Sequence, residues 1–291
     1  MNKLFEGIDV SKWQGEINWD EVKKSGIQFA MLRCGYGKTQ GQHDEFFEIN
    51  YKNAKAAGIP VGAYHYSYAK STGDAKKEAD YCLSLLKGKT FEFPIAFDIE
   101  DKSQQDLSKD AVSDIIKTFC QTVEDAGYYV SVYANLWWYN NKIDDSVTKL
   151  YDVWLAQWSD APTLKKDFGM WQYTSGGSVG GISGRVDMNF AYKNYPNIMK
   201  VNGLNGHKKQ SSGSEEPKNE FTARQAISLY NTPLYVSATA AKESAKKSGT
   251  YYIYDGKEIN GRYRITSSSE RAGKTPISTN VTGYVNKKDI K

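Results

Sequence analysis

The first 200 residues alternate short apolar runs with segments of helical periodicity, and this alternation most constrains the fold. Three segments, 44–58, 71–88 and 108–127, have helical spacing, begin near Asp, Ser or Thr, and stop at Gly. Strands that alternate with helices over this length predict a parallel (β/α) barrel. The apolar runs that we interpret as its eight strands are 6–11, 29–36, 61–67, 94–100, 129–135, 152–158, 169–174 and 186–191.

The spacing of the last strands modifies this prediction. The last three gaps between strands are too short for full helices, so we expect an irregular, TIM-like barrel with fewer helices than strands. An open doubly wound sheet is the alternative, but the first strand lacks the Gly-rich phosphate loop of a nucleotide-binding version. The Gly-rich run 175–185 has no Walker lysine and no helix after it, so we interpret it as a loop.

The composition changes at residues 201–220, which are polar and rich in Gly, Ser, Lys and Glu. That composition is typical of a linker. We therefore predict a first domain at 1–200, a linker at 201–219 and a second domain at 220–291. The second domain contains short runs rich in Tyr, Val and Ile, broken by Asn, Asp and Gly, which predict a small all-β module with hairpins.

Charge is distributed unevenly between these parts. Residues 1–200 hold 23 Lys and Arg against 26 Asp and Glu, whereas residues 201–291 hold 15 against 8. A basic C-terminal part favours an anionic partner, such as nucleic acid, an anionic polymer or a charged surface. A basic module with no charge-driven partner is the alternative.

The cysteines and the N-terminus indicate in which cellular compartment the chain is made. Cys34, Cys82 and Cys120 are odd in number and far apart, which indicates neither a disulfide framework nor a zinc site. They favour buried free thiols in a chain made in a reducing compartment. The N-terminus has no apolar core of signal-peptide length, and no apolar run is long enough to span a membrane. We therefore expect no classical export signal and no membrane insertion.

Candidate catalytic residues follow from the alternation of side chains along a strand. In a (β/α) barrel the catalytic groups lie at the C-terminal strand ends, and residues two apart share a face. In the run 94–100, Phe97 and Ile99 are expected under the helices, with Phe93 on the same face, and the acids on the other. The acids expected to converge inside the barrel are Asp9, Asp98, Glu100 and Asp187.

The same alternation predicts an aromatic lining around the acids. The chain has 21 Tyr and 7 Trp, and sugar rings stack on such side chains. Glycosidic cleavage commonly uses a pair of carboxyl groups, so this combination favours a carbohydrate site. The predicted inward residues are Tyr64, Tyr66, Ser131, Tyr133, Asn135, Trp154, Trp158, Met170, Gln172 and Thr174, and Trp137 directly follows the fifth strand.

Two other kinds of site remain as alternatives. Several carboxylates together could hold a hard cation. No histidine supports a transition-metal site or a Ser/His/Asp triad, because His43 lies in a predicted loop, His65 has outward parity and His207 lies in the linker. Like charges packed together destabilise a protein, so a cluster of four acids indicates a functional site. We expect an acid site without metal or cofactor.

Five stretches, taken in order, resemble the glycoside hydrolase family 25 lysozymes, which are N-acetylmuramidases of phages, bacteria and some fungi. They are GIDVSKWQGEINW, VGAYHYSY, PIAFDIE, GMWQYT and GRVDMN, and the resemblance covers roughly residues 4–195. It implies an irregular (β/α) barrel with fewer helices than strands. The stretches GTYYIYDGKEINGRYRIT and TGYVN are similar to bacterial SH3-like cell-wall-binding modules. This layout implies a phage endolysin that acts on Gram-positive cell walls.

The resemblance implies a peptidoglycan hydrolase that cleaves the β-1,4 bond between N-acetylmuramic acid and N-acetylglucosamine. Glu100 would be the general acid and then the base. Asp98 would either attack the anomeric carbon or stabilise an oxazolinium formed by the substrate's own 2-acetamido group, and we favour the second course. Asp9 and Asp187 would hold electrostatics and water in place.

Further implications concern contacts and partners. We expect sugar contacts from Tyr64, Tyr66, Tyr133, Trp137 and Trp158, with Arg33 and Asn135 as polar candidates. Glycan strands would occupy the first domain, and wall peptide or an anionic wall polymer the second, with no nucleic acid. The chain would be made in the host cytoplasm and act on the wall after release. A bacterial autolysin and a non-catalytic wall-binding lectin are the alternatives.

Overall fold

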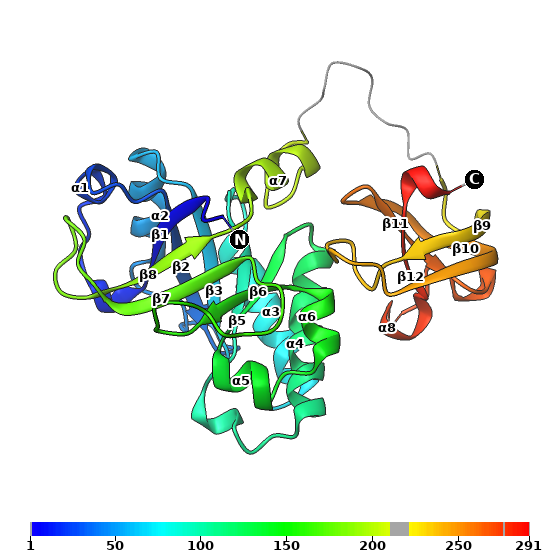
Figure 1. Ribbon diagram of the computed structural model, residues 1–291, viewed down its shortest axis with the longest axis horizontal. Coiled ribbons are helices and arrows are strands. Elements are labelled where there is room, and N and C mark those ends of the chain that lie inside the picture. Colours follow the sequence, from blue (N-terminus) through cyan, green and yellow to red (C-terminus); the bar gives the residue numbers. More distant parts are fainter. Residues whose placement is uncertain (1, 210–220, 276, 291) are drawn as a thin grey trace. The chain divides into compact units, whose positions relative to one another are not determined.

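The computed structural model describes residues 2–209, 221–275 and 277–290. The chain forms two compact units, Met1–Lys209 and Gln210–Lys291. In the first unit, eight strands close into a barrel in sequence order (Figure 1). These strands are β1 (Phe5–Val10), β2 (Phe29–Tyr36), β3 (Val61–Tyr66), β4 (Ile95–Asp98), β5 (Val130–Asn135), β6 (Asp152–Ala156), β7 (Met170–Gly177) and β8 (Val186–Ala191).

The direction of the last strand corrects the expectation of a wholly parallel barrel. Strands β1 to β7 each run parallel to the next. Strand β8 is antiparallel both to β7 and to β1. A parallel connection needs a crossover of about a dozen or more residues. Because only residues 178–185 join β7 to β8, the chain turns back instead.

Helices surround part of the barrel. Their bounds are α1 (Trp19–Lys24), α2 (Phe47–Ala56), α3 (Thr72–Leu86), α4 (Lys109–Asp125), α5 (Leu136–Asn141), α6 (Asp145–Leu150) and α7 (Tyr195–Asn202). Residues 157–169 and 178–185, all within the described part of the chain, contain no helix, as the short gaps predicted. The third short gap, between β5 and β6, instead contains the two six-residue helices α5 and α6. Helix α4 begins where the Ser108 side chain accepts from the N–H of Ala111, and its C-terminal turn is followed by Gly127 at a φ of 89°.

Aromatic rings pack on both sides of the barrel wall. On the outside, Phe97 stacks on Phe119 of α4, with ring centroids 4.2 Å apart. On the inside, Phe93 stacks on Phe29 at 4.2 Å. Phe93 was expected outside with Phe97, but it precedes β4, so the alternation of that strand does not extend to it. A Cβ on Gly7 would lie 2.4 Å from the Phe29 ring, so glycine at that position makes room for the interior ring.

The first unit extends past the predicted domain boundary. Residues 201–209, expected to begin the linker, belong to the barrel unit. The fully buried Asn205 ties them to it: its Oδ1 accepts from the Tyr129 N–H at 2.7 Å, and its Nδ2 donates to the Phe93 carbonyl at 2.7 Å. The remainder of the predicted linker, 210–219, lies outside the described residues.

The second unit is a four-stranded antiparallel sheet in the order β12-β11-β10-β9. Its elements are β9 (Ala226–Leu234), β10 (Ala245–Ile259), β11 (Arg262–Thr266), the short helix α8 (Ile277–Asn280) and β12 (Gly283–Asn286). Its core is formed by Phe221, Ile227, Leu229, Leu234, Ile253, Tyr263, Ile265 and Val285. A separate all-β sheet therefore follows the mixed barrel, as the sequence predicted.

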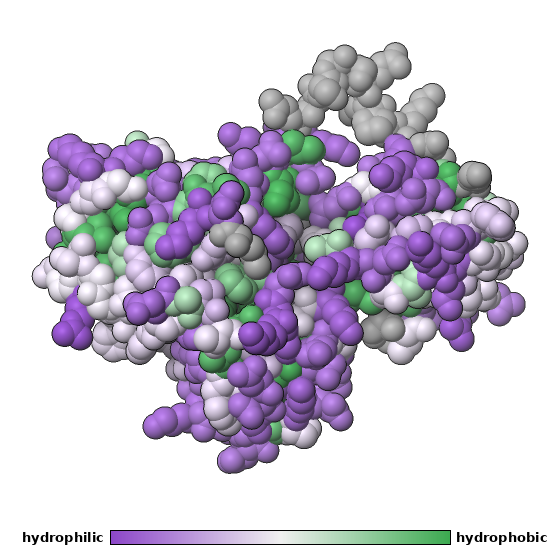
Figure 2. All heavy atoms as spheres, viewed as in Figure 1, coloured by the Kyte–Doolittle hydropathy of each residue, from purple (hydrophilic) through white to green (hydrophobic). Residues whose placement is uncertain are grey.

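The visible surfaces of both units are largely hydrophilic (Figure 2). Among the described residues, no helix has the length and apolar character needed to cross a membrane.

Candidate active site

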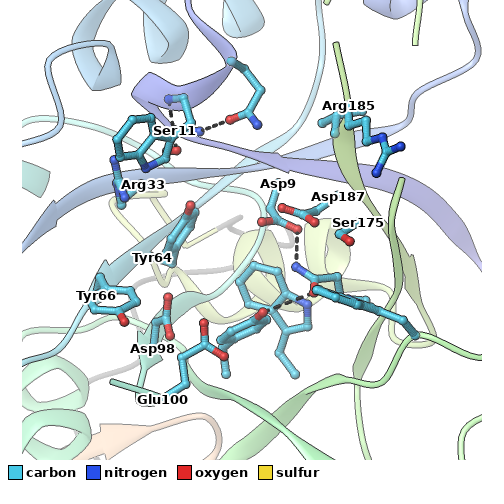
Figure 3. A pocket seen from close by; sticks show the side chains of 17 residues that line it. Asp9, Ser11, Arg33, Tyr64, Tyr66, Asp98, Glu100, Ser175, Arg185 and Asp187 are labelled. Atoms are coloured by element: carbon cyan, nitrogen blue, oxygen red, sulfur yellow. Dashed lines mark hydrogen bonds between the residues drawn. The ribbon is translucent and has the colours of Figure 1, made fainter. Parts of the chain in front are cut away.

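A pocket of about 410 Å³ opens at the barrel rim where strands β1, β3, β4 and β5 end (Figure 3). Its volume lies within the usual range for small-molecule sites. The pocket brings together the four acids predicted to converge. The lining residues are Asp9, Ser11, Trp13, Gln14, Arg33, Tyr64, Tyr66, Asp98, Glu100, Tyr133, Trp154, Trp158, Gln172, Ser175, Arg185, Val186 and Asp187.

Asp187 reaches this rim because β8 runs backwards. It is the second residue of its strand, so in a parallel barrel it would lie at the opposite end. In the antiparallel pairing of β1 and β8, Asp9 and Asp187 are direct partners, and Figure 3 shows their carboxyl groups side by side. The alternation of side chains predicted the inward face correctly, and the strand direction decided the rim.

Two amides hold the carboxylate of Asp9. Gln172 Nε2 and Asn189 Nδ2 both donate to Asp9 Oδ2, at 2.9 and 2.8 Å. Trp154 Nε1 donates to Asn189 Oδ1 at 2.8 Å, and Trp158 Nε1 donates to Gln172 Oε1 at 2.9 Å. Because an indole nitrogen only donates, it fixes which end of each amide faces Asp9. The arrangement therefore holds Asp9 Oδ2 as a hydrogen-bond acceptor.

Burial and mutual repulsion raise the pKa values of the acids. Burial and the charge of Asp187 raise the pKa of Asp9 to about 7, although its two amide partners oppose the shift. Burial, Asp187 and Asp101 raise the pKa of Glu100 to about 7. Burial raises the pKa of Asp187 to about 6. The site therefore exchanges protons near neutral pH, where general acid–base catalysis is most effective.

Asp98 is the most enclosed of the four acids, with 3% of its surface exposed. Burial, Glu100 and Asp9 raise its pKa well above the usual range, and the positive charge of Arg33 opposes them. Its Oδ1 has no hydrogen-bond partner among the described residues. A buried oxygen without a partner is costly, so it is suited to receive a donor from a bound molecule.

Most of the predicted contact residues line the pocket, as Figure 3 shows for Arg33, Tyr64 and Tyr66. Tyr133 and Trp158 line it as well. Arg33 also forms an ion pair with the buried Asp44, with Nε and Oδ2 2.7 Å apart.

Trp137 and Asn135 do not line this pocket. Asn135 caps helix α5, and its Oδ1 accepts from the Trp138 N–H, so its side chain follows the helix. Trp137 lies in that helix with its ring edge-on to Trp138.

The pocket residues missed from the sequence include Trp13 and Arg185. Trp13 lies three residues after the end of β1, in a short 3-10 turn (Lys12–Gln14), and is 77% exposed, and Trp158 is 64% exposed. A large aromatic just after the end of an inward-facing barrel strand was the available signal. Exposed tryptophans beside a polar pocket offer flat apolar faces to a ligand. Arg185 ends the glycine-rich run and carried no comparable signal.

The described residues contain one group with metal-ligand spacing. It comprises Cys34, His65 and Cys82, none of which lines the pocket. The four acids at the rim are not such a group.

Comparisons with known proteins identify the family. A family model described as Glycosyl hydrolases family 25 matches residues 8–182, well over half of the chain. The chain belongs to this family. The resemblance in the sequence motifs is thereby confirmed for the barrel, and the matched range includes Asp9, Asp98 and Glu100.

Relatives of this family 25 chain include both lysozymes and a phage protein. Lysozyme M1 of Streptomyces globisporus is 35% identical over 203 residues, which cover 63% of this chain and 66% of that protein, just under two thirds. The crystal structure of a lysozyme from Streptomyces coelicolor matches with a TM-score of 0.56 and 31% identity, over 66% of this chain and 94% of that one. The catalytic domain of endolysin ply40 from bacteriophage P40 of Listeria monocytogenes matches with a TM-score of 0.56 and 25% identity, over 68% and 97%.

Proposed function

We propose that this family 25 protein is a lysozyme, an N-acetylmuramidase that cleaves the β-1,4 bond between N-acetylmuramic acid and N-acetylglucosamine in peptidoglycan. The observation that carries the proposal is Glu100, an acid with its pKa raised to about 7 in a pocket with three further acids and aromatic walls. An acid that holds its proton near neutral pH can protonate a leaving alcohol. The lysozyme relatives support peptidoglycan as the substrate.

In this mechanism Glu100 handles the proton. Its carboxyl group donates the proton to the glycosidic oxygen as the bond to the anomeric carbon breaks. The resulting carboxylate then removes a proton from the water that attacks that carbon, which restores the starting state. Substrate binding would exclude water from the pocket and strengthen each of these interactions.

Asp98 would act on the positive charge that develops at the sugar. We favour substrate assistance, in which the oxygen of the 2-acetamido group attacks the anomeric carbon and forms an oxazolinium. The acetamido N–H would then donate to Asp98 Oδ1, which has no partner among the described residues. Direct attack by Asp98 on the anomeric carbon is the alternative.

The remaining pocket residues would position the glycan. Asp9, fixed by Gln172 and Asn189, would orient a hydroxyl group or water beside the anomeric carbon, together with Asp187. Exposed Trp13 and Trp158 would stack on sugar rings. Tyr64, Tyr66, Tyr133 and Arg33 would contribute further contacts from the pocket wall.

A single substitution tests the proposed acid. Glu100→Gln keeps the shape of the side chain but cannot donate a carboxyl proton, so the clearing rate of purified Gram-positive cell walls should fall by at least about a hundredfold. Asp106→Asn, at an exposed position outside the pocket, is the matched control and should clear walls at the parent rate. Products should carry N-acetylmuramic acid at their new reducing ends.

Two results would refute the assignment. Equal clearing by the parent protein and Glu100→Gln would remove Glu100 as the acid. Binding to walls without clearing by the parent protein would favour a lectin. The Glu100→Gln variant should unfold at the parent temperature, which shows that its loss of clearing is not a loss of fold.

We also propose that the chain is an endolysin of phage type, made in the host cytoplasm, which acts on Gram-positive walls after release. The layout of one family 25 barrel and one small all-β unit supports this, as does the similarity to the endolysin of bacteriophage P40. We infer that the second unit is an SH3-like module that binds wall peptide or an anionic wall polymer. A bacterial autolysin of the same activity is the alternative.

A further inference from the structure

Cys34, His65 and Cys82 form a buried cluster on the outer side of the barrel wall, away from the pocket. They come from β2, β3 and α3, and each has 0% of its surface exposed. Their possible ligand atoms, two Sγ and one ring nitrogen, all lie within 4.8 Å of one another. The proposed reaction gives this cluster no role.

The ring of His65 is oriented as in a metal ligand. Its Nε2 lies 2.8 Å from the Gly37 carbonyl oxygen, which can only accept, so Nε2 carries the hydrogen. The other nitrogen, Nδ1, is buried and has no hydrogen-bond partner within the described part of the chain. Metal-bound histidines usually donate their second ring N–H to a carbonyl or carboxylate in this way. The lone pair of Nδ1 is therefore available to a cation.

The two thiols have the separation that a shared metal ion requires. Cys34 Sγ and Cys82 Sγ are 3.8 Å apart. A disulfide would place them at about 2.05 Å. Two thiolates on a tetrahedral zinc ion, with bonds of about 2.3 Å, lie about 3.8 Å apart.

We propose that Cys34, His65 and Cys82 bind a thiophilic divalent cation, Zn²⁺, through both Sγ atoms and His65 Nδ1. Binding displaces the protons of the two thiols into solvent. Two thiolates and a neutral imidazole then balance the charge of the ion, so the occupied site adds no net charge to the core. Sulfur and imidazole donors select zinc over magnesium or calcium.

Glu78 is the candidate for a fourth donor, although its carboxylate lies outside the group of ligand atoms that are within 4.8 Å of one another. It lies one helical turn before Cys82 on the buried face of α3, and 1% of its surface is exposed. Its Oε1 accepts from the Tyr68 N–H at 2.9 Å, whereas its Oε2 has no hydrogen-bond partner among the described residues. Zinc is almost always four-coordinate in structural sites, so Glu78 would complete the set only if its side chain turned towards the ion, and it would bring its proton with it if the site is to stay neutral.

The site would act on stability rather than on the reaction. Its ligands join helix α3 to strands β2 and β3, and all are closed to solvent, so the ion would enter as the chain folds. Ligands from three separate elements also explain why the spacing of cysteines in the sequence indicated no zinc site. Loss of the ion should therefore lower the unfolding temperature and leave the positions of the pocket acids unchanged.

The test is metal content and spectroscopy on the full chain. Protein expressed with added zinc and dialysed should retain about one equivalent by elemental analysis. Cys34→Ser and Cys82→Ser should each lower the retained zinc at least about tenfold, whereas Cys120→Ser, a buried free cysteine in α4, should not change it. Glu78→Gln should weaken binding less than either cysteine variant. A chelator should also lower the unfolding temperature of the parent protein.

Refolding of the parent protein with Co²⁺ keeps the test independent of the variants. A thiolate-to-cobalt charge-transfer band with the visible bands of a tetrahedral ion is expected, and Cys120→Ser should give the same spectrum. Absence of both zinc and the cobalt bands from folded parent protein would overturn the proposal. A Cys34–Cys82 disulfide in protein purified without reductant, detected as a loss of two hydrogens by mass, would overturn it in favour of a redox pair.

Discussion

Glu100 and Asp101 are adjacent in the chain and their pKa values shift in opposite directions. Burial is the largest cause of the shift that raises the pKa of Glu100 to about 7. Burial would also raise the pKa of Asp101, but hydrogen bonds from Ser103 and Tyr66 lower it. Asp101 caps a 3-10 turn, Lys102–Gln104, and its carboxylate accepts from the Ser103 N–H. At the scale of single residues, the surroundings therefore decide which of two neighbouring acids can keep a proton for catalysis.

The pH dependence of the reaction should report the pKa of Glu100. The proton donor must be protonated, and its pKa is raised to about 7, so kcat/KM on cell walls should fall about tenfold per pH unit above that value. The measurement is the rate of wall clearing at constant ionic strength from about pH 5 to pH 9.

The matched control for this profile is Asp106→Asn, which should reproduce the parent curve. Asp9 and Asp187 have pKa values raised to about 7 and about 6, so they add to the same decline if they must also hold protons. A rate that stays constant up to pH 9 would contradict the role of Glu100.

At the scale of elements, the reversal of β8 completes the site. The strand carries Asp187 and Asn189 on its inward face, and both act on Asp9: one faces it across the sheet and the other donates to it. A longer segment between β7 and β8 would permit a parallel strand, with these residues at the wrong end of the barrel. The short loop is therefore as important to the pocket as the acids themselves.

The segment after α7 is a second element whose role depends on one side chain. Asn205→Ala removes both hydrogen bonds of the Asn205 side chain, leaves the Tyr129 N–H and the Phe93 carbonyl without that partner, and places alanine at a φ of 54°. The expected loss is about 2–4 kcal/mol of unfolding free energy, measured by chemical denaturation.

Asn202→Ala is the control for this change. The Asn202 amide donates only to the Ile198 carbonyl within the same helix in the described contacts, so its loss should cost less than about 1 kcal/mol. Equal denaturation midpoints for the two variants would show that residues 201–209 are not part of the folded barrel.

At the scale of the whole molecule, charge separates the two units. The basic excess lies in the second unit, residues 210–291, with 13 Lys and Arg against 8 Asp and Glu. If the second unit binds an anionic wall polymer, a fragment of residues 210–291 should bind walls at least about tenfold more weakly when salt rises from about 0.05 to about 0.5 M. Co-sedimentation with purified walls measures the affinity.

The wall preparation supplies the control for that experiment. Walls stripped of anionic polymer should retain little of the fragment at low salt, whereas intact walls should retain most of it. Affinity that is unchanged by salt and by stripping would contradict charge-driven binding and favour recognition of wall peptide.

The sequence by itself determined the class of fold and most of the site. Periodicities of 2 and 3.6 residues are local properties, so they revealed the strands, the helices and the inward faces of Asp9, Asp98 and Glu100. Local capping also revealed the start of α4 at Ser108. The predicted contacts Tyr64 and Tyr133 reached the pocket for the same reason.

Only the tertiary structure decided the rest, because it depends on which distant segments become neighbours. Closure of the barrel set the direction of β8, and so brought Asp187 to the rim. Contacts between separate strands turned the amides of Gln172 and Asn189 towards Asp9 and raised the pKa values of the acids. Packing of α3 on the barrel likewise assembled a thiol and imidazole cluster from residues up to 48 positions apart, which no local spacing in the chain reveals.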